Sequence, residues 1–433
     1  MTPASLEPES RSVPSMRGSE QRGVSGSPSG LRALVIAPHE FYIDRGSPIA
    51  VDVLMRALSA LNVAVDLVVY RGGQERLYQG VTIHRAHTPG WLRDIRPGFS
   101  LRKLAADWWL FAKARELMAR NRYDIVHAGE EAVFAAMWFR ARRRVPFVYD
   151  MDSSLAEQLV QGQPLLRPVA WIFQWCERRA IRAALAVAPV CNALAAYAAE
   201  RRAQHIVTLH DISQLDPQTV TPTGALRDRL HVRGLMLMYV GNLESYQGID
   251  LLLQAFAVAR AQDADVDLVV AGGSPAHITS YRSKAQRLGI ASSTHFIGPW
   301  PAARLGELLA EADILTAPRI RGSNTPMKIF PYMHSGRPLL VTAVPSHTQI
   351  LDSSVCELAA AQPEAFGSAI VQLARDPERR RRLGEAGRQF VERNHVFEAH
   401  LSRVRTLYTH VAASVRGQAD GPPDGPPVQP ELI

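Results

Sequence analysis

Hydrophobic positions in this chain come in short, almost uninterrupted runs that alternate with longer stretches of helical spacing. The first run, LRALVIAP at 31–38, has the pattern of a strand buried on both faces of a parallel sheet. A polar loop, a stretch with apolar residues every three or four positions (49–62) and a second apolar run (63–70) follow it. Strand, loop, helix and strand in this order predict a βαβ unit with parallel strands.

The same alternation continues to about residue 212. Helical patterns are evident at 100–121 and 130–143, between apolar runs typical of buried strands. Repeated βα units of this kind predict one doubly wound α/β domain over 31–212. Its further strands are expected at 81–86, 123–128, 146–154, 185–190 and 205–211.

After residue 212 the alternation breaks and then restarts. Residues 213–234 mix prolines, threonines and charges, and we interpret them as a linker with a first helix. Strand and helix patterns resume over 235–394, which predicts a second α/β domain. A last helix over 395–415 is a candidate to cross back to the first domain. The tails, 1–30 and 416–433, are rich in Pro, Gly and polar residues, and we expect them to be disordered.

Composition and charge fit this picture and restrict the function. The 433 residues are too many for one ordinary core, and 47% hydrophobic and 21% charged residues are usual for a globular protein. The formal net charge of +8 favours anionic partners, such as nucleic acid, phosphorylated substrates or an anionic membrane surface. The three widely spaced cysteines form neither a disulfide framework nor a zinc motif, and the N-terminus lacks the apolar segment of a signal peptide. We therefore expect a cytoplasmic location.

One polar loop is a candidate anion site. It lies within 317–342, between an apolar strand and a short helical stretch, MKIFPYMHSG. Pro326 is predicted in the first helical turn, where the missing N–H has no partner to lose. A loop at a helix N-terminus of an α/β fold is a usual place for phosphate, and fixed positive charge strengthens the prediction. The candidate residues are Arg319, Arg321, Gly322, Ser323, Asn324, Thr325, Pro326 and Lys328.

The second domain carries motifs that resemble the donor domain of family 4 glycosyltransferases. In order along the chain these are VGNLESYQGIDLLLQAF, VVAGGSP, HFIGPW and NTPMKIFPYMHSGRPLLVT. The first domain resembles the family more loosely, in RGSPIAVDVLMRAL, DIVHAGEEA and PFVYDMDSS. The resemblance implies the GT-B architecture, an α/β fold with two Rossmann-like domains that face each other across a cleft. It also implies retaining transfer of a sugar from a nucleotide-diphosphate sugar, which is a substrate, without a metal or another cofactor.

The resemblance places the nucleotide diphosphate on the second domain. The family has an Arg or Asn and a Lys in the pattern around GNLESYQG, and this sequence has Asn242 and Gln247 there, so the lysine charge is missing. Arg319, Arg321 and Lys328 are hypothesised to supply it, although Lys328 also fits a solvated helix position. The other donor-site candidates from the matching motifs are Gly46, Ser47, Gly241, Asn242, Gln247, Gly272 and Gly273.

A second departure concerns two carboxylates. The paired glutamates of the family, eight residues apart, would fall at Ser323 and Pro331. Their absence marks either a subgroup that binds the donor through backbone N–H groups and hydroxyls over 322–325, or an impaired enzyme. We favour the active form, since a loop before a helix offers several free N–H donors.

The first domain holds the acceptor-side candidates. Many family members have a histidine where this chain has Asp152, and His127 ends a predicted strand whose carboxyl end faces the cleft. Asp152, His127 and Lys328 are therefore the catalytic candidates, while a helix cap for Asp152 and a structural pairing for His127 stay open. Asp150 and Asp152 superficially form a D-x-D metal motif, but the same spacing recurs at 263–267, and no metal site is predicted.

The helix predicted at 100–121 is both aromatic and basic. Trp108 and Trp109 lie beside Lys103 and Lys113, and a basic run, RARRR, follows at 140–144. Such a helix can lie on an anionic bilayer, although an internal helix with one solvated face has the same pattern. No helix-turn-helix or zinc-finger signature is present, so nucleic acid is not an expected partner.

These observations lead to one main hypothesis and two alternatives. The main hypothesis is a retaining glycosyltransferase that acts on a glycan or lipid-linked acceptor in cell-envelope or exopolysaccharide synthesis, in the cytoplasm or at the inner face of the cytoplasmic membrane. The alternatives are a nucleotide-sugar-binding protein with impaired catalysis and a GT-B sugar-nucleotide epimerase.

Overall fold

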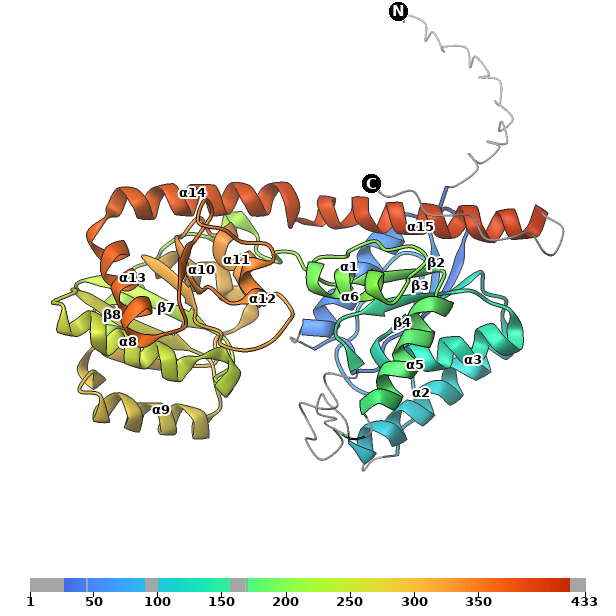
Figure 1. The fold of residues 1–433 in the computed structure, drawn as a ribbon, viewed down its shortest axis with the longest axis horizontal. Coiled ribbons are helices and arrows are strands. Elements are labelled where there is room, and N and C mark those ends of the chain that lie inside the picture. The colour runs from blue at the N-terminus through green and yellow to red at the C-terminus, as the bar shows by residue number, and fades with distance from the viewer. Residues whose placement is uncertain (1–26, 44–45, 90–99, 156–167, 169, 421–433) are drawn as a thin grey trace, which may run out of the picture.

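The protein consists of two α/β lobes joined along one side by two long helices (Figure 1). This computed structural model describes residues 27–43, 46–89, 100–155, 168 and 170–420, and the outer parts of the predicted tails lie outside these ranges. Each lobe contains one six-stranded sheet in which every pairing is parallel. The buried apolar runs of the sequence form these strands, as expected when helices cover both faces of a sheet.

The first sheet has the strand order β3-β2-β1-β4-β5-β6. Helices α2 (Leu101–Arg120), α3 (Val133–Arg143) and α5 (Ala170–Ala183) pack on one face, and α1 (Gly46–Ala60) packs on the other. α6 (Asn192–Glu200) follows the last strand. The strands are β1 (Arg32–Ile36), β2 (Ala64–Val69), β3 (Val81–Arg85), β4 (Ile125–Gly129), β5 (Phe147–Met151) and β6 (Ala186–Pro189).

The second sheet repeats this plan with the order β12-β11-β10-β7-β8-β9. In both sheets the chain turns from one direction of growth to the other beside the first strand, between β1 and β4 and between β7 and β10. Ligands of doubly wound folds bind at the carboxyl end of such a switch point. The strands are β7 (Leu235–Val240), β8 (Val266–Ala271), β9 (Thr294–Gly298), β10 (Ile314–Ala317), β11 (Leu339–Thr342) and β12 (Glu357–Ala359). The helices are α7 (Ala225–Leu230), α8 (Ile249–Ala261), α9 (Pro275–Arg287), α10 (Leu305–Glu311), α11 (Ile329–His334), α12 (Pro345–Thr348), α13 (Pro363–Arg375) and α14 (Pro377–Asn394).

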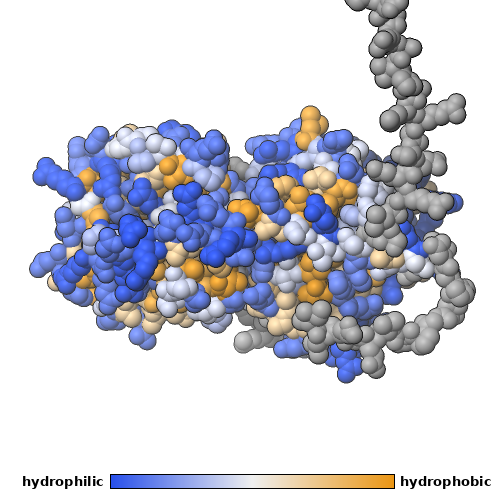
Figure 2. Space-filling model, turned by 90° about the horizontal axis from the view of Figure 1, so that it is seen from above, coloured by the Kyte–Doolittle hydropathy of each residue, from blue (hydrophilic) through white to orange (hydrophobic). Residues whose placement is uncertain are grey.

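The C-terminal helix connects the two lobes. α15 (Phe397–Asp420) follows α14, leaves the second lobe and packs on the first, where Leu407 and Val411 join the core formed by α1 and β1 (Figure 1). It continues five residues beyond its predicted end at 415. Seen from the side on which α14 and α15 lie, the surface of both lobes is mainly hydrophilic, with hydrophobic residues in scattered patches (Figure 2).

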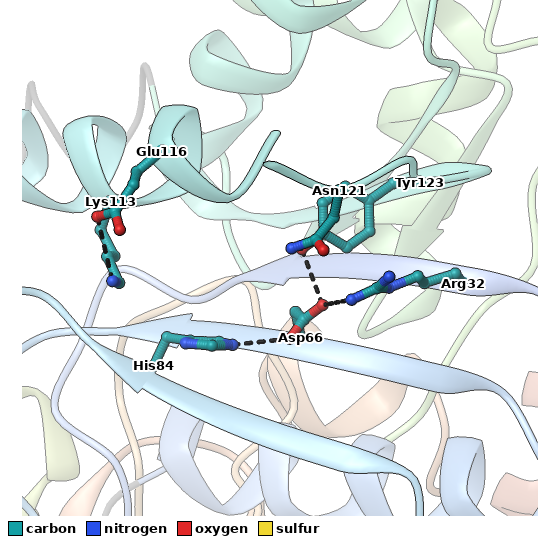
Figure 3. Close-up of polar contacts among 7 residues, drawn as sticks. All are labelled: Arg32, Asp66, His84, Lys113, Glu116, Asn121 and Tyr123. Atoms are coloured by element: carbon teal, nitrogen blue, oxygen red, sulfur yellow. Dashed lines mark hydrogen bonds and ion pairs between the residues drawn. The ribbon is translucent and has the colours of Figure 1, made fainter. Parts of the chain in front are cut away.

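A buried carboxylate ties the first three strands to the segment before β4. Asp66 accepts hydrogen bonds from Arg32 (2.9 Å) and Tyr123 (2.8 Å), and its other oxygen lies 2.7 Å from Nε2 of His84 (Figure 3). Burial raises the pKa of Asp66, but the hydrogen bonds from His84, Tyr123 and Arg32 outweigh it and leave the pKa below its usual value. The network therefore holds the first sheet together with an ionised carboxylate.

Two predicted elements differ from the observed ones. Residues 205–211 were expected to form a strand, but apart from one isolated bridge at Ile206 they run beside β6 without regular pairing. The helix expected at 327–336 contains only six residues, Ile329–His334, because the backbone first makes turns closed by hydrogen bonds to Pro326 and Met327. Pro326 thus precedes the helix and does not lie in its first turn.

Candidate functional site

The ammonium group of Lys328 lies at the switch point of the second sheet. Its Nζ donates hydrogen bonds to the hydroxyl of Tyr239 (2.7 Å) and to Oε1 of Gln247 (3.0 Å), and it lies 4.2 Å from the centre of the Tyr239 ring. Tyr239 is on β7, Gln247 follows in the next loop, and Lys328 follows β10. The lysine is therefore held in place by the two strands between which the sheet changes direction.

Glycines allow the backbone to pack closely around this lysine. Gly241 follows β7 with a φ of +147°, and a Cβ there would lie 2.5 Å from Nζ of Lys328. Gly272 follows β8 with a φ of +112°, and a Cβ there would overlap the carbonyl oxygen of Gly241. Only glycine fits at these two positions, because Lys328 and the Gly241 carbonyl already occupy the space that a Cβ would need.

A second cation lies close to Lys328. The Arg319 guanidinium donates to the carbonyl oxygens of Arg321 (2.7 Å) and Asn324 (3.1 Å) and lies 5.4 Å from the centre of the Tyr246 ring. Burial, followed by the charge of Arg319, lowers the pKa of Lys328 to about 7. In the part of the chain that the structure describes, neither cation forms an ion pair with a carboxylate.

A buried histidine completes this group. Nδ1 of His347 lies 2.8 Å from the carbonyl oxygen of Thr342, and the Thr342 hydroxyl donates to the carbonyl oxygen of Arg319. Burial lowers the pKa of His347 to about 4, and the charges of Arg319 and Lys328 act in the same direction. Its Nε2 is buried without a hydrogen-bond partner. His347 is therefore a neutral imidazole close to the two cations.

The predicted loop contacts the first domain. The Asn324 side chain donates to the carbonyl oxygen of Asp152, and the carbonyl oxygen of Ser323 accepts from Gln349 (2.9 Å). Gln349 also accepts from Asn192 and from the backbone N–H of residue 193 in the first domain. Because α11 has only six residues, its dipole adds little, and attraction for an anion at this site comes from Lys328 and Arg319.

The first domain brings a set of carboxyl groups to the same interface. Ser47, in the first turn of α1, hydrogen-bonds the Asp152 side chain, and Gly46 lies so close to Met327 that a Cβ would be 3.3 Å from its sulfur. Burial, then the charge of Asp150, raises the pKa of Asp152 to about 7. A cavity of about 20 Å³ lies between the domains, lined by Asp150, Asp152, His210, Asp211, Met327 and His400, among others.

A further carboxyl group lies at the switch point of the first sheet. Glu130 directly follows β4, and burial, then the charge of Glu131, raises its pKa to about 8. Lys103 of α2 contacts Glu131 and lies 3.9 Å from Glu130. At neutral pH this group can therefore hold protons that a hydroxyl-bearing ligand could share.

The structure separates the predicted site residues into two sets. Gly241, Gln247, Gly272, Arg319 and Lys328 come together on the second domain, and Gly273 packs on Leu243 beside them. Gly46, Ser47 and Asp152 face the loop that contains Gly322, Ser323, Asn324, Thr325 and Pro326.

Three predicted residues lie apart from these sets. Asn242 and Arg321 are exposed, and neither side chain forms a hydrogen bond with Lys328. His127 is 1% exposed, and its ring lies between Asp150 (3.2 Å) and Tyr408 of α15 (3.1 Å). It is therefore enclosed between these two side chains within the first domain.

Tyr239 and Gln349 were not predicted from the sequence. Tyr239 belongs to the apolar run of β7, and Gln349 lies in a helix end with no motif. Among the described residues, no three His, Cys, Asp or Glu side chains gather in a way that could hold a metal ion. In the same residues, no helix has both the length and the apolar character that crossing a membrane requires.

The arrangement can bind an anion with several negative charges against the second domain. Two cations without carboxylate partners among the described residues suit a diphosphate. The carboxyl groups of the first domain suit hydroxyl groups of a second molecule.

Sequence and structure comparisons agree with this geometry. Residues 234–376 match the family described as "Glycosyl transferases group 1", and residues 45–211 match "Glycosyl transferase 4-like domain". A D-inositol 3-phosphate glycosyltransferase from Kribbella flavida is 25% identical over 430 residues, covering 90% of this chain and 92% of that protein.

Two solved structures show the same fold. A sucrose-phosphate synthase from Thermosynechococcus elongatus has a TM-score of 0.71 at 17% identity and covers 89% of this chain and 100% of its own. HepE from Anabaena, solved in complex with UDP and glucose, has a TM-score of 0.64 at 14% identity and covers 87% of this chain and 99% of its own. Both matched families and both parallel sheets lead to one assignment: the chain belongs to the group 1, family 4-like glycosyltransferases and has their GT-B fold, with two Rossmann-like domains facing across a cleft.

Proposed function

We propose that this glycosyltransferase moves a sugar, with retention at the anomeric carbon, from a nucleotide-diphosphate sugar to a glycan or lipid-linked acceptor. We further propose that it needs no metal and works in cell-envelope or exopolysaccharide synthesis, at the inner face of the cytoplasmic membrane. The observation that carries the proposal is the pair Lys328 and Arg319, two cations without a carboxylate partner among the described residues at the switch point of the second domain.

An anionic ligand explains this pair. Burial and a neighbouring arginine destabilise the protonated form of this lysine, and a negative charge that enters the site stabilises it. The diphosphate of a nucleotide sugar brings such charge to Lys328, at the switch point of the second sheet. The complex of HepE with UDP and glucose makes UDP-glucose the first donor to test.

The proposed reaction is a substitution at the anomeric carbon with retention. The bond between the anomeric carbon and the diphosphate oxygen breaks, the acceptor oxygen bonds to the same face of that carbon, and the acceptor proton passes to the leaving phosphate. Lys328 and Arg319 stabilise the negative charge that develops on the leaving group. Asp152, beside Ser47 and opposite Asn324, accepts a hydrogen bond from the acceptor hydroxyl and orients it.

A donor panel tests this function. The purified full chain is incubated with labelled UDP-, GDP- and ADP-sugars and with lipid and glycan extracts. Label that moves to lipid or glycan supports transfer, whereas conversion of the free donor supports an epimerase. Lys328→Ala should reduce turnover about 100-fold with unchanged circular dichroism, while Lys284→Ala on α9 should not. Unchanged turnover of Lys328→Ala would overturn the role given to this lysine.

A second candidate function rests on Ser323 and Pro331. Both stand where related enzymes are expected to have glutamates, and a protein that only binds nucleotide sugars would tolerate their loss. This alternative predicts tight donor binding by calorimetry without transfer of label to any acceptor. Ser323→Glu distinguishes the two: it raises transfer if the missing carboxylate impairs the enzyme, and it lowers transfer if the present loop already binds the donor sugar.

A further inference from the structure

Large hydrophobic side chains are exposed on one side of the first domain. Trp108 of α2 is 67% exposed, and on α5 the exposure of Trp171 is 65% and that of Trp175 is 53%. Phe134 and Trp138 of α3 are exposed as well. Figure 1 shows α2, α3 and α5 together on the side of this lobe that faces away from α15. Exposed aromatic residues concentrated on three neighbouring helices indicate a surface that contacts something apolar.

The aromatic residues of α2 and α3 form one continuous layer. Phe111 of α2 lies 5.3 Å from Trp138 and 5.7 Å from Phe139 of α3, and 6.2 Å from Trp108, between ring centres. An apolar groove of about 560 Å³ opens between these helices, lined by Leu104, Trp108, Phe111, Phe134, Trp138 and Phe173, among others. The rings are thus held by each other and still present their outer faces to solvent.

The same three helices carry the positive charge of the chain. Together they contain eleven Lys and Arg residues against three Asp and Glu residues. Their net charge of +8 equals that of the whole chain, so the other residues sum to zero. A surface that is both aromatic and strongly cationic differs from the apolar interface of a protein dimer, which is depleted in charge.

The cations that the surface presents are arginines. Both lysines predicted for it are engaged elsewhere, since Lys103 is buried against Glu131 and Lys113 binds Glu116 (3.1 Å). Arg142, Arg178 and Arg179 are exposed, and within the described ranges none of them pairs with a carboxylate. Two stack on tryptophans: Arg142 lies 6.0 Å from the Trp138 ring and Arg179 4.9 Å from the Trp175 ring.

Helices α3 and α5 arrange aromatic residues and arginines in the same order. Phe134, Trp138 and Arg142 follow at intervals of four on α3, and Trp171, Trp175 and Arg179 do so on α5. Residues four apart share a helix face, so each stripe runs from aromatic to arginine. Because α3 and α5 follow β4 and β5, the aromatic ends lie at the carboxyl edge of the sheet, where Asp152 binds the acceptor in the proposed function.

We propose that this face of α2, α3 and α5 docks on an anionic phospholipid bilayer. The tryptophans enter the interface between head groups and acyl chains, and the arginines bind lipid phosphates. Charge complementarity selects this occupant over a second copy of the chain, whose identical surface would oppose arginines with arginines. The inference deepens the proposed function, and rests on it, in that docking brings a lipid-linked acceptor to the edge of the sheet that carries Asp152.

Vesicle binding tests the proposal with the full chain and without any donor. Co-sedimentation is measured with vesicles of phosphatidylcholine and with an equimolar mixture of phosphatidylcholine and phosphatidylglycerol, together with tryptophan emission. We expect binding to the anionic vesicles only, with a blue shift, and weaker binding at high salt. The triple variant Arg142→Gln, Arg178→Gln, Arg179→Gln should bind about 100-fold more weakly. Trp171→Ser with Trp175→Ser should lose at least about tenfold.

Matched controls separate docking from general charge. Arg381→Gln, Arg382→Gln, Arg393→Gln on α14 removes the same charge from the other domain and should keep full binding, as should Leu77→Ser, whose side chain is 97% exposed. Equal binding to neutral vesicles, no binding to either kind, or equal loss in the α14 variant would each overturn the proposal. So would self-association that the tryptophan variant abolishes. Calorimetry with the donor on the same protein distinguishes the two proposals. If the protein binds vesicles but not the donor, the proposed transfer function is rejected and the membrane docking is not.

Discussion

Donor binding should return a proton to Lys328. Burial and the charge of Arg319 lower the pKa of this lysine to about 7 in the free protein. At pH 8, therefore, only about one tenth of the molecules carry the proton. A bound diphosphate places negative charge next to Nζ and raises the pKa towards about 10.5, the value of an unperturbed lysine. Binding at pH 8 should then take up about 0.9 proton per site, against about 0.1 at pH 6.

Calorimetry measures this uptake directly. The apparent binding enthalpy of the nucleotide sugar is compared in buffers of different ionisation enthalpy, and its slope gives the number of protons. A nucleotide sugar is the suitable ligand because its diphosphate is a diester with no proton to exchange near neutral pH. By linkage, donor affinity should fall by up to about tenfold per pH unit above pH 7, since the site must first be protonated.

Two variants decide the interpretation. Lys328→Met removes the titrating group and should abolish both the uptake and the fall in affinity above pH 7. Lys284→Met is the matched control, because Lys284 pairs with Asp250 on the outer side of the second domain and should leave both unchanged. An uptake near zero at pH 8 in the native chain, or the same uptake in Lys328→Met, would refute a charge role for this lysine.

Three other perturbations follow from the structure. Gly241→Ser places a Cβ 2.5 Å from Nζ of Lys328 and should abolish donor binding in calorimetry while circular dichroism shows a folded chain. Asp66→Asn should lower the free energy of unfolding in urea by about 1–3 kcal/mol at pH 7; because the pKa of Asp66 is lowered in the folded state, this difference should vanish as the pH falls below about 4. Burial lowers the pKa of His400 to about 4, so as the pH falls this histidine is protonated in the unfolded chain before it is protonated in the folded one. The melting temperature should therefore decrease between about pH 6.5 and pH 4. His400→Phe should make this decrease smaller without abolishing it, because the pKa values of other buried histidines, such as His39 and His210, are lowered in the same way.

The fold could be predicted because both sheets are parallel. A strand covered by helices on both faces needs an unbroken apolar run, and such runs mark β1, β2, β7 and β8 in the sequence. Residues 205–211 are less apolar, and only Leu209 among them is buried. They join β6 through three backbone hydrogen bonds, which involve Val187 and Pro189, and do not form a regular strand.

The site could be predicted only in part, because contacts from distant segments decide it. His127 was expected at the cleft, since a strand end is adjacent to it. The face that a strand residue presents depends on what packs there, and Tyr408, 281 residues away, covers His127. Tyr239 was missed for the converse reason: within an apolar strand, its hydroxyl gives no sequence signal that it will bind Lys328. The sequence indicated a surface position for Lys103, but its side chain is buried and pairs with Glu131, which lies 28 residues later in the chain.

The same contacts offer a physical reason for the serine at 323. A glutamate there would add negative charge next to Asn324, whose side chain binds the carbonyl of Asp152. The pKa values of Asp152 and Asp211 are already raised, first by burial and then by neighbouring carboxylates. A further carboxylate would increase this repulsion across the interface, whereas Ser323 leaves its carbonyl to Gln349 and so ties the loop to the first domain. The loop that lacks the carboxylates is thus the one that holds the two domains together beside Lys328, and its sequence suits domain closure as well as donor binding.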